Sequence, residues 1–218
     1  MQTLHPPSTG GGQRSRVGNV TWLLDAASFH HEFDALFSHL SGPAGTAPLR
    51  ERATTLWQSS DPVVADYVSR LPFETPEEWE VGFEEHHLGQ WYRLLMAAYL
   101  TPGLDLEHPT TLRQRLPELG WSPADARRVA HGRELVCLAE LFGAPGPATA
   151  LALVLGTGNK GWLSQDDVDA TLRQLQSLDR RAFRRAQELV PACDDLWTCL
   201  ESAAAHPDRV VLVLPAIP

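Results

Sequence analysis

Two short runs of apolar, β-prone residues mark the two ends of the patterned part of the chain. The first run is VTWLL at residues 20–24, and the second is VVLVL at residues 210–214, which Pro215 ends. β-Branched and aromatic residues favour strands. Because a buried strand must pair its backbone N–H and C=O groups, the simplest arrangement joins the two runs in one small sheet.

Between these runs, apolar residues recur at helical spacing in the first half of the chain. After Asp25, which with Ser28 is a candidate N-cap, one helical face carries five apolar residues: Phe29, Phe33, Leu36, Phe37 and Leu40. Further helices are predicted at about 48–59, from Asp61-Pro62 to Leu71, and at about 76–100, where Thr101-Pro102-Gly103 ends the pattern.

Capping residues position the helices of the second half. The segment SPADARRVAHG (122–132) combines a serine cap, a proline at the first helical position and a terminal glycine, and SQDD (164–167) opens an amphipathic helix. Three other helices are predicted at 133–142, at about 179–190, and from Asp194 or Asp195 to about Ala205. The pattern predicts an α+β fold, predominantly helical, in which a small sheet pairs the N-terminal and C-terminal strands.

Length and composition indicate how many domains the chain forms and in which cellular compartment it is expected. The 218 residues suit a single domain, predicted at 17–218, and residues 1–16 are rich in Gly, Ser and Pro and are predicted to be a flexible tail. Those 16 residues lack the apolar core of a signal peptide, and no apolar run reaches the ~20 residues of a membrane span. The three cysteines are odd in number and form no CxxC motif, which indicates a reducing, cytoplasmic setting.

The balance of charge restricts the partners. The chain has 27 acidic and 18 basic residues, so its formal net charge is −9. This field repels phosphate backbones and disfavours nucleic acid, whereas it suits a basic protein partner or simply keeps the protein soluble. The best candidate for a local basic patch is a group of four arginines: Arg180, Arg181, Arg184 and Arg185. Such a group is more typical of a solvated helix face than of a binding site.

The stretch GTGNKG (156–161) matches the G-x-G-x-x-G pattern of dinucleotide sites. It follows the apolar run ATALALVL (148–155), which fits a buried strand or a buried helix equally well. The next helix is capped by Ser164, so the third glycine lies before the helix, and the residues after Gly161 are too few for the rest of a doubly wound sheet. We therefore expect an ordinary glycine-rich loop and no cofactor.

Two clusters of histidine and acidic residues are the best candidate metal ligands. His30 and His31 lie on the first predicted helix, and Glu84 and His87 have the i,i+3 spacing of carboxylate-bridged metal sites in helical bundles. Imidazole and carboxylate groups together suit a transition metal. A di-metal bundle site requires two Glu-x-x-His motifs, and the sequence has one. His87 also falls on an apolar face, where a buried core histidine is the alternative.

The order of elements near the C-terminus carries a family resemblance. A glycine-led turn, a capped helix ending in Leu-x-x-Leu-x-x-Leu-Asp, a second short helix, and a helix leading into a strand follow one another at 161–187 and 196–215. These segments, with 119–135, resemble the YfbM-like family of bacterial proteins of unknown function. The resemblance covers about half the chain and implies an α+β fold whose first and last strands share a sheet. Residues 25–115 depart from it as a helical insertion.

The sequence shows no catalytic motif, and the resemblance carries over no catalytic residue. No G-x-S-x-G elbow is present, and Cys193 lies beside Asp194 and Asp195, which disfavour a thiolate. We expect a non-enzymatic protein-interaction module, such as an immunity protein that neutralises a toxin. The alternatives are a metal-dependent hydrolase or oxygenase using the His/Glu cluster, and a small-molecule pocket lined by Trp79, Trp91 and Trp121.

Overall fold

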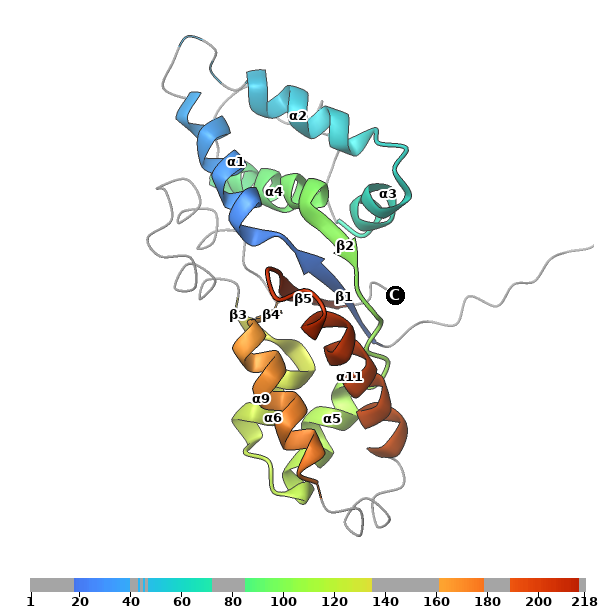
Figure 1. Cartoon of the computed structure of the whole chain (residues 1–218). Coiled ribbons are helices and arrows are strands. Elements are labelled where there is room, and N and C mark those ends of the chain that lie inside the picture. Colours follow the sequence, from blue (N-terminus) through green and yellow to red (C-terminus); the bar gives the residue numbers. More distant parts are fainter. Residues whose placement is uncertain are drawn as a thin grey trace, which may run out of the picture.

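The protein is an α+β molecule in which two layers of helices enclose a small sheet (Figure 1). The computed structural model describes residues 18–39, 43, 45, 47–71, 85–134, 161–178 and 189–215. Within this part, the upper layer of Figure 1 contains α1 (Ala26–Ser38), α2 (Ala47–Trp57), α3 (Pro62–Ser69), α4 (Glu85–Met96) and the 3-10 turn η3 (Ala97–Tyr99). The lower layer contains α5 (Pro109–Arg115), the 3-10 turn η4 (Leu116–Leu119), α6 (Pro123–His131), α9 (Gln165–Gln176) and α11 (Leu189–Ala204).

The sheet joins the two ends of the patterned chain. Its strands are β1 (Asn19–Leu24), β2 (Leu100–Pro102), β3 (Arg133–Glu134), β4 (Gly161–Leu163) and β5 (Val210–Pro215). They lie in the order β2-β1-β5-β4-β3, and all neighbours are antiparallel. Trp22 lies opposite Leu212 in the β1–β5 ladder. The predicted pairing of the N-terminal and C-terminal strands is therefore confirmed.

The three other strands were not predicted from the sequence. Residues 100–102 were expected to end a helix, 133–134 to begin one, and 161–163 to be a loop, but all three segments are strands. Each has only two or three residues, which is too short to show an alternating pattern of its own. Their conformation is set by hydrogen bonds to neighbouring strands, and such long-range pairing leaves no local trace in the sequence.

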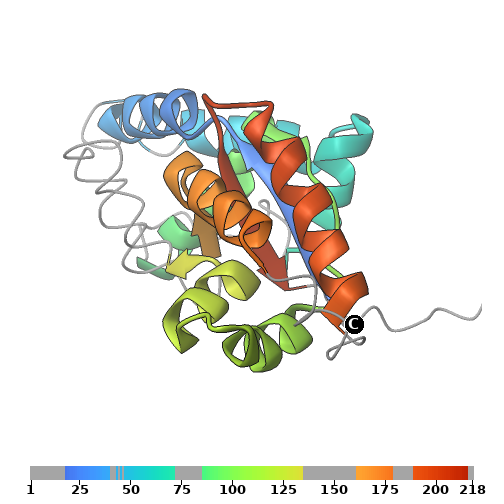
Figure 2. The same cartoon turned by 60° about the horizontal axis from the view of Figure 1, so that its bottom comes forward.

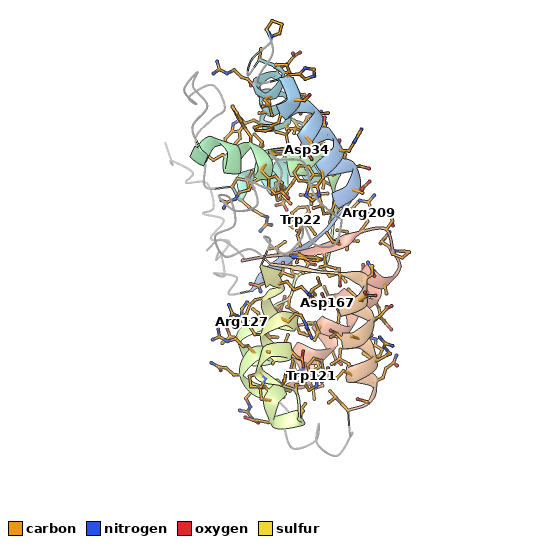
Figure 3. The ribbon with its side chains drawn as sticks, turned by 90° about the vertical axis from the view of Figure 1, so that its left-hand side faces the viewer. Trp22, Asp34, Trp121, Arg127, Asp167 and Arg209 are labelled. Atoms are coloured by element: carbon orange, nitrogen blue, oxygen red, sulfur yellow. The ribbon has the colours of Figure 1, made fainter. Side chains whose placement is uncertain are left out.

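Successive side chains of the two long strands, β1 and β5, point to opposite faces of the sheet, so a hydrophobic core forms on each face. Trp22 and Leu212 face the upper helices, whereas Leu23 and Val211 face the lower helices. All four are at most 4% exposed. Figure 2 shows the lower helices in front of the sheet, and Figure 3 shows Trp22 and Trp121 on opposite sides of it. Since both cores use the same strands, neither layer buries its apolar face without the sheet.

Side-chain caps start the helices where the sequence placed them. The Asp25 carboxylate accepts a hydrogen bond from the Ser28 backbone at 3.0 Å, and the Asp61 carboxylate accepts one from Val63 at 2.8 Å. Ser122 and Ser164 cap α6 and α9. These caps satisfy N–H groups that have no partner within the helix, so local sequence signals are sufficient to locate them.

The last helix differs from the prediction. We expected a break at Pro191 and a new start at Asp194 or Asp195, but α11 begins at Leu189 and continues without interruption to Ala204. Pro191 is its third residue. A proline is tolerated in the first turn because its missing N–H would have no intrahelical partner there. Among the described helices, none combines the length and apolar character that crossing a membrane requires.

Candidate functional site

The first predicted metal ligand, His30, belongs to the core of the upper layer. It is 7% exposed, and its Nε2 atom lies 2.8 Å from the Tyr92 hydroxyl. The ring also contacts Phe29. Burial lowers the pKa of His30 to about 4, although the nearby Asp34 carboxylate opposes this shift. His30 is therefore a neutral core histidine near neutral pH, held by a hydrogen bond to a buried tyrosine.

The other three predicted ligands are not brought to His30 by the described structure. His31 is exposed on α1, and consecutive residues of a helix point about 100° apart. Glu84 lies outside the described residues, and so does the side chain of His87, although its backbone belongs to α4. The four-residue metal site therefore stays a prediction.

The tryptophans that could line a pocket separate into different cores. Trp91 is 1% exposed in the upper core, and Trp121 is 3% exposed in the lower core. Trp79 lies outside the described residues. Because the sheet lies between Trp91 and Trp121, these two side chains do not line one pocket, and that part of the prediction is wrong.

A set of potential ligand atoms that the sequence did not indicate lies where α5 meets α11. Glu107 and His108 precede α5, and Asp195 lies on α11. One ligand atom from each of the three side chains lies within 4.8 Å of the others, and His108 Nε2 is 3.9 Å from Asp195 Oδ2. Glu107 and His108 are exposed and Asp195 is half-buried. We call these three residues the acidic cluster.

Within the described residues, the carboxylates of the acidic cluster have His108 beside them but no lysine or arginine partner. Within the described residues, neither Glu107 nor Asp195 forms an ion pair with a lysine or arginine. Two neighbouring carboxylates repel each other unless a cation lies between them. The cluster is therefore a surface position that attracts positive charge.

Asn19, the first residue of β1, connects the acidic cluster to the end of α6. Its backbone exchanges two hydrogen bonds of 2.8 Å with Leu106, the residue before Glu107. Its side-chain amide donates to the Ala130 carbonyl at 2.7 Å and lies 3.4 Å from His131 Nδ1. Asn19 is 7% exposed, so this polar side chain is buried with its donors satisfied.

A second set of charged residues comes from α5 and α6. Arg113 in the last turn of α5 and Arg127 on α6 are exposed, and His131 ends α6. Burial lowers the pKa of His131, and the positive charges of Arg113 and Arg127 lower it further. Figure 3 shows Arg127 on the lower layer. We call these three residues the basic cluster.

The buried Asp167 on α9 is a structural ion-pair centre. Its two carboxylate oxygens accept hydrogen bonds from Arg133 at 2.8 Å each, and Ser164 completes a capping box with it. Burial by itself would raise the pKa of Asp167, but the hydrogen bonds from Arg133 and Ser164 hold it below its ordinary value. Figure 3 shows Asp167 inside the lower layer. This group connects β3 to α9, and its oxygens are fully engaged.

Two other features carry little chemistry. A hollow of about 190 Å³ lies between the start of α9 and the start of β5, but Gln165 there already donates to the carbonyls of His206 and Arg209. Such a volume is below that of typical ligand sites. Cys193 and Cys199 are free and buried, and burial raises the pKa of both thiols, that of Cys193 to about 12. Neither thiol is a reactive nucleophile at neutral pH.

Comparison of the chain with family models, with curated proteins and with solved structures finds no match. The fold defines a helical α+β protein with two cores on one sheet, and the two charged clusters are its distinctive surface chemistry. Sequence reasoning used the end of α6 only to locate the helix, through its terminal glycine. It missed both clusters as sites because only the packing of α5 against α6 and α11 brings their members together.

Proposed function

We propose that the chain is a non-enzymatic protein-interaction module that binds a basic protein through the acidic cluster. A toxin-neutralising immunity protein is the most concrete form of this function. The observation that carries the proposal is the pair of carboxylates, Glu107 and Asp195, that meet from distant segments with His108 beside them but with no lysine or arginine partner among the described residues. An arginine of a partner protein could bind between these two carboxylates, because its guanidinium donates several parallel hydrogen bonds to carboxylate oxygens.

The overall charge supports the same proposal. With a net charge of −9, the chain attracts a basic protein over a distance of about a Debye length and accelerates their encounter. The YfbM-like resemblance, which we also propose, is compatible with a sheet that pairs the first and last strands. That family supplies no activity of its own.

Three of the described groups with shifted pKa values serve packing. His30 and Tyr92 share a hydrogen bond inside the upper core, and Asp167 caps a helix. Catalytic acids and bases with shifted pKa values normally face a cleft. These groups instead face other core residues, which favours an interaction protein over an enzyme.

Charge removal at the acidic cluster tests the proposal. Candidate partners are the basic proteins encoded by genes next to that of this chain, each purified and titrated into it by calorimetry. The double variant Glu107→Gln, Asp195→Asn should bind its partner about tenfold to a hundredfold more weakly than the wild type, mainly at low salt. Glu51→Gln is the matched control, because Glu51 is exposed on α2 in the opposite layer.

Two results would count against this function. One is the absence of a complex with any neighbouring gene product. The other is a complex that forms with equal affinity in the double variant and the wild type. In that second case an interaction would exist, but the acidic cluster would not be its contact surface.

The acidic cluster also supports a second candidate, the binding of a divalent metal. One imidazole nitrogen and two carboxylate oxygens form a donor set that zinc accepts, with a fourth position for water. Zinc requires ligand distances of about 2.0–2.2 Å, so small rotations of these side chains must bring them inward. Glu107 and His108 are exposed and have room for such rotations.

Titration with zinc separates the two candidates. If the cluster holds the metal, His108→Ala abolishes zinc binding, and His206→Ala, an exposed histidine after α11, leaves it unchanged. If the cluster binds a basic protein, His108→Ala leaves that complex almost intact because both carboxylates remain. Zinc binding that survives in His108→Ala would point to the predicted site of His30, His31, Glu84 and His87. No zinc binding by the wild type would remove both metal hypotheses.

A further inference from the structure

The outer face of α11 combines apolar and acidic side chains in one line. Four residues follow one another along the helix at the spacing i, i+4, i+7 and i+11: Val190, Asp194, Trp197 and Glu201. In a helix with 3.6 residues per turn, these positions lie within about 60° of one another and span about 16 Å. We call these four residues the α11 stripe. Figure 2 shows α11 beside α9 on the near side of the sheet.

The two apolar members of the α11 stripe reach the surface. Val190 is 39% exposed, and only Leu104, at 42%, is a more exposed large hydrophobic residue in the described chain. Trp197 is half-buried, since one part of it packs against the lower core and the rest meets solvent. Four other described tryptophans are at most 3% exposed: Trp22, Trp91, Trp121 and Trp162. Surface aromatic residues are enriched at protein interfaces, where one side packs and the other side binds.

The two carboxylates of the α11 stripe have no role within the helix. Asp194 and Glu201 are exposed, and no lysine or arginine lies three or four residues from either of them. Within the described residues, neither carboxylate forms an ion pair. The first turn of α11 contains no acidic residue, so neither group gains from the positive end of the helix dipole, and Glu201 lies towards the unfavourable end.

The order of residues in the α11 stripe places an indole between two negative charges. Trp197 lies three residues after Asp194 and four residues before Glu201, and at such spacings the Cβ atoms are about 5–6 Å apart. A guanidinium stacked on the exposed part of the indole is therefore within reach of both carboxylates. This position combines a cation–π contact with charge-assisted hydrogen bonds, which an arginine makes better than a lysine.

We propose that the α11 stripe is the docking surface for a cationic α-helix of the basic partner. This inference rests on the proposed function, and it names the kind of segment that the partner presents. A partner helix laid along α11 places an apolar residue on Val190 and, two turns further on, an arginine over Trp197. The surface is continuous with the acidic cluster, because Asp195 follows Asp194 on the same helix. Charge and apolar contact are thus complementary at the same spacing.

Synthetic helices serve as the probes for this surface. The first is a helical peptide of about 18 residues whose one face carries leucine and arginine two turns apart. The second has the same composition in a permuted order that has no such face. Fluorescence anisotropy of the labelled peptides should show that the first binds the wild-type chain about tenfold more tightly than the second. Two-dimensional NMR of the indole N–H groups should show the Trp197 signal moving with the first peptide, and Trp197→Phe identifies that signal by its loss.

Two double variants separate recognition from overall charge. Asp194→Asn, Glu201→Gln should weaken binding of the first peptide about tenfold, because it removes both charge-assisted contacts around the indole. Asp166→Asn, Asp169→Asn is the matched control, since it removes the same two negative charges from exposed positions of the neighbouring helix α9. The control should bind the first peptide about as tightly as the wild type does.

Several results would overturn this inference. They are equal binding of the two peptides, equal weakening by the two double variants, a Trp197 signal that does not move, and no binding of the first peptide at all. Failure of the proposed function has a different signature, namely that no basic protein encoded nearby binds the chain. If such a protein binds and only Glu107→Gln, Asp195→Asn weakens its complex, the proposed function stands and docking on the α11 stripe is wrong.

Discussion

At the scale of single residues, burial separates structural side chains from surface chemistry. The sequence identified His30 and His31 as a pair of possible ligands. The helical pattern already indicated that His30 is the more buried of the two, because it lies three residues before Phe33 and therefore beside the apolar face. The hydrogen bond to Tyr92 had no sequence signal, since Tyr92 is 62 residues away.

The buried His30 makes a testable contribution to acid sensitivity. Its pKa is about 4 in the folded protein and 6.5 when unfolded, so the unfolded state binds more protons between these pH values. Stability is therefore fully present above pH 6.5 and is lost as the pH falls towards about 4, by about 3 kcal/mol in total. In His30→Gln, which can still hydrogen-bond Tyr92, this part of the pH dependence should disappear. Urea unfolding at several pH values between 7.5 and 4 measures it.

The adjacent histidine is the control for this experiment. His31→Gln changes an exposed side chain of the same type on the same helix, so its stability should follow the wild type at every pH. If His30→Gln and the wild type lose stability in parallel between pH 6.5 and 4, His30 is not the neutral buried group that its hydrogen bond implies.

At the scale of elements, prediction succeeded where the signal is local. The caps Asp25, Asp61, Ser122 and Ser164 were located from sequence because a cap and the N–H groups that it satisfies lie within three residues. Strand β3 was missed because it exists through its pairing with β4, whose own residues were assigned to a loop. The ion pair between Arg133 and Asp167 depends on that pairing and was missed with it.

Asp167 is the residue at which a local cap and a long-range contact coincide. Asp167→Asn should destabilise the protein by about 2 kcal/mol, because it weakens two charge-assisted hydrogen bonds from the half-exposed Arg133 and the capping box of α9. Thermal and urea unfolding measure the change. Asp166→Asn is the control, since Asp166 is exposed one residue earlier on the same turn and should change stability by about 0.5 kcal/mol or less.

The pH dependence gives a second check on Asp167. Its lowered pKa in the folded protein means that its contribution is present above the unfolded value of 3.8 and is lost as the pH falls below it. The difference in stability between the wild type and Asp167→Asn should therefore be constant near neutral pH and should shrink in strong acid. A difference that already shrinks near pH 6 would show that another group causes the destabilisation.

At the scale of the whole molecule, backbone pairing was predictable and surface sites were not. The two apolar runs that form β1 and β5 need hydrogen-bond partners for their backbone N–H and C=O groups. They pair with each other, so each run supplies the partners of the other. The acidic and basic clusters have no comparable requirement. Their members come from segments that are far apart in the sequence, and Asn19 bonds to two of these segments, at Leu106 and at Ala130, which is 111 residues away.

The shared sheet predicts that the two cores unfold together, as a single domain would. Leu212 faces the upper core and Val211 the lower core, and both are 1% exposed on the central strand β5. Leu212→Ala should cost about 3 kcal/mol and Val211→Ala about 2 kcal/mol. Because either variant weakens the strand that both layers need, global unfolding should accelerate hydrogen exchange about a hundredfold in Leu212→Ala, equally in α1 and in α11. Hydrogen exchange measured by mass spectrometry on peptides from these two helices shows whether the two cores unfold together. If Leu212→Ala accelerated α1 alone and Val211→Ala accelerated α11 alone, the layers would be independent units, and the single-domain prediction would be wrong.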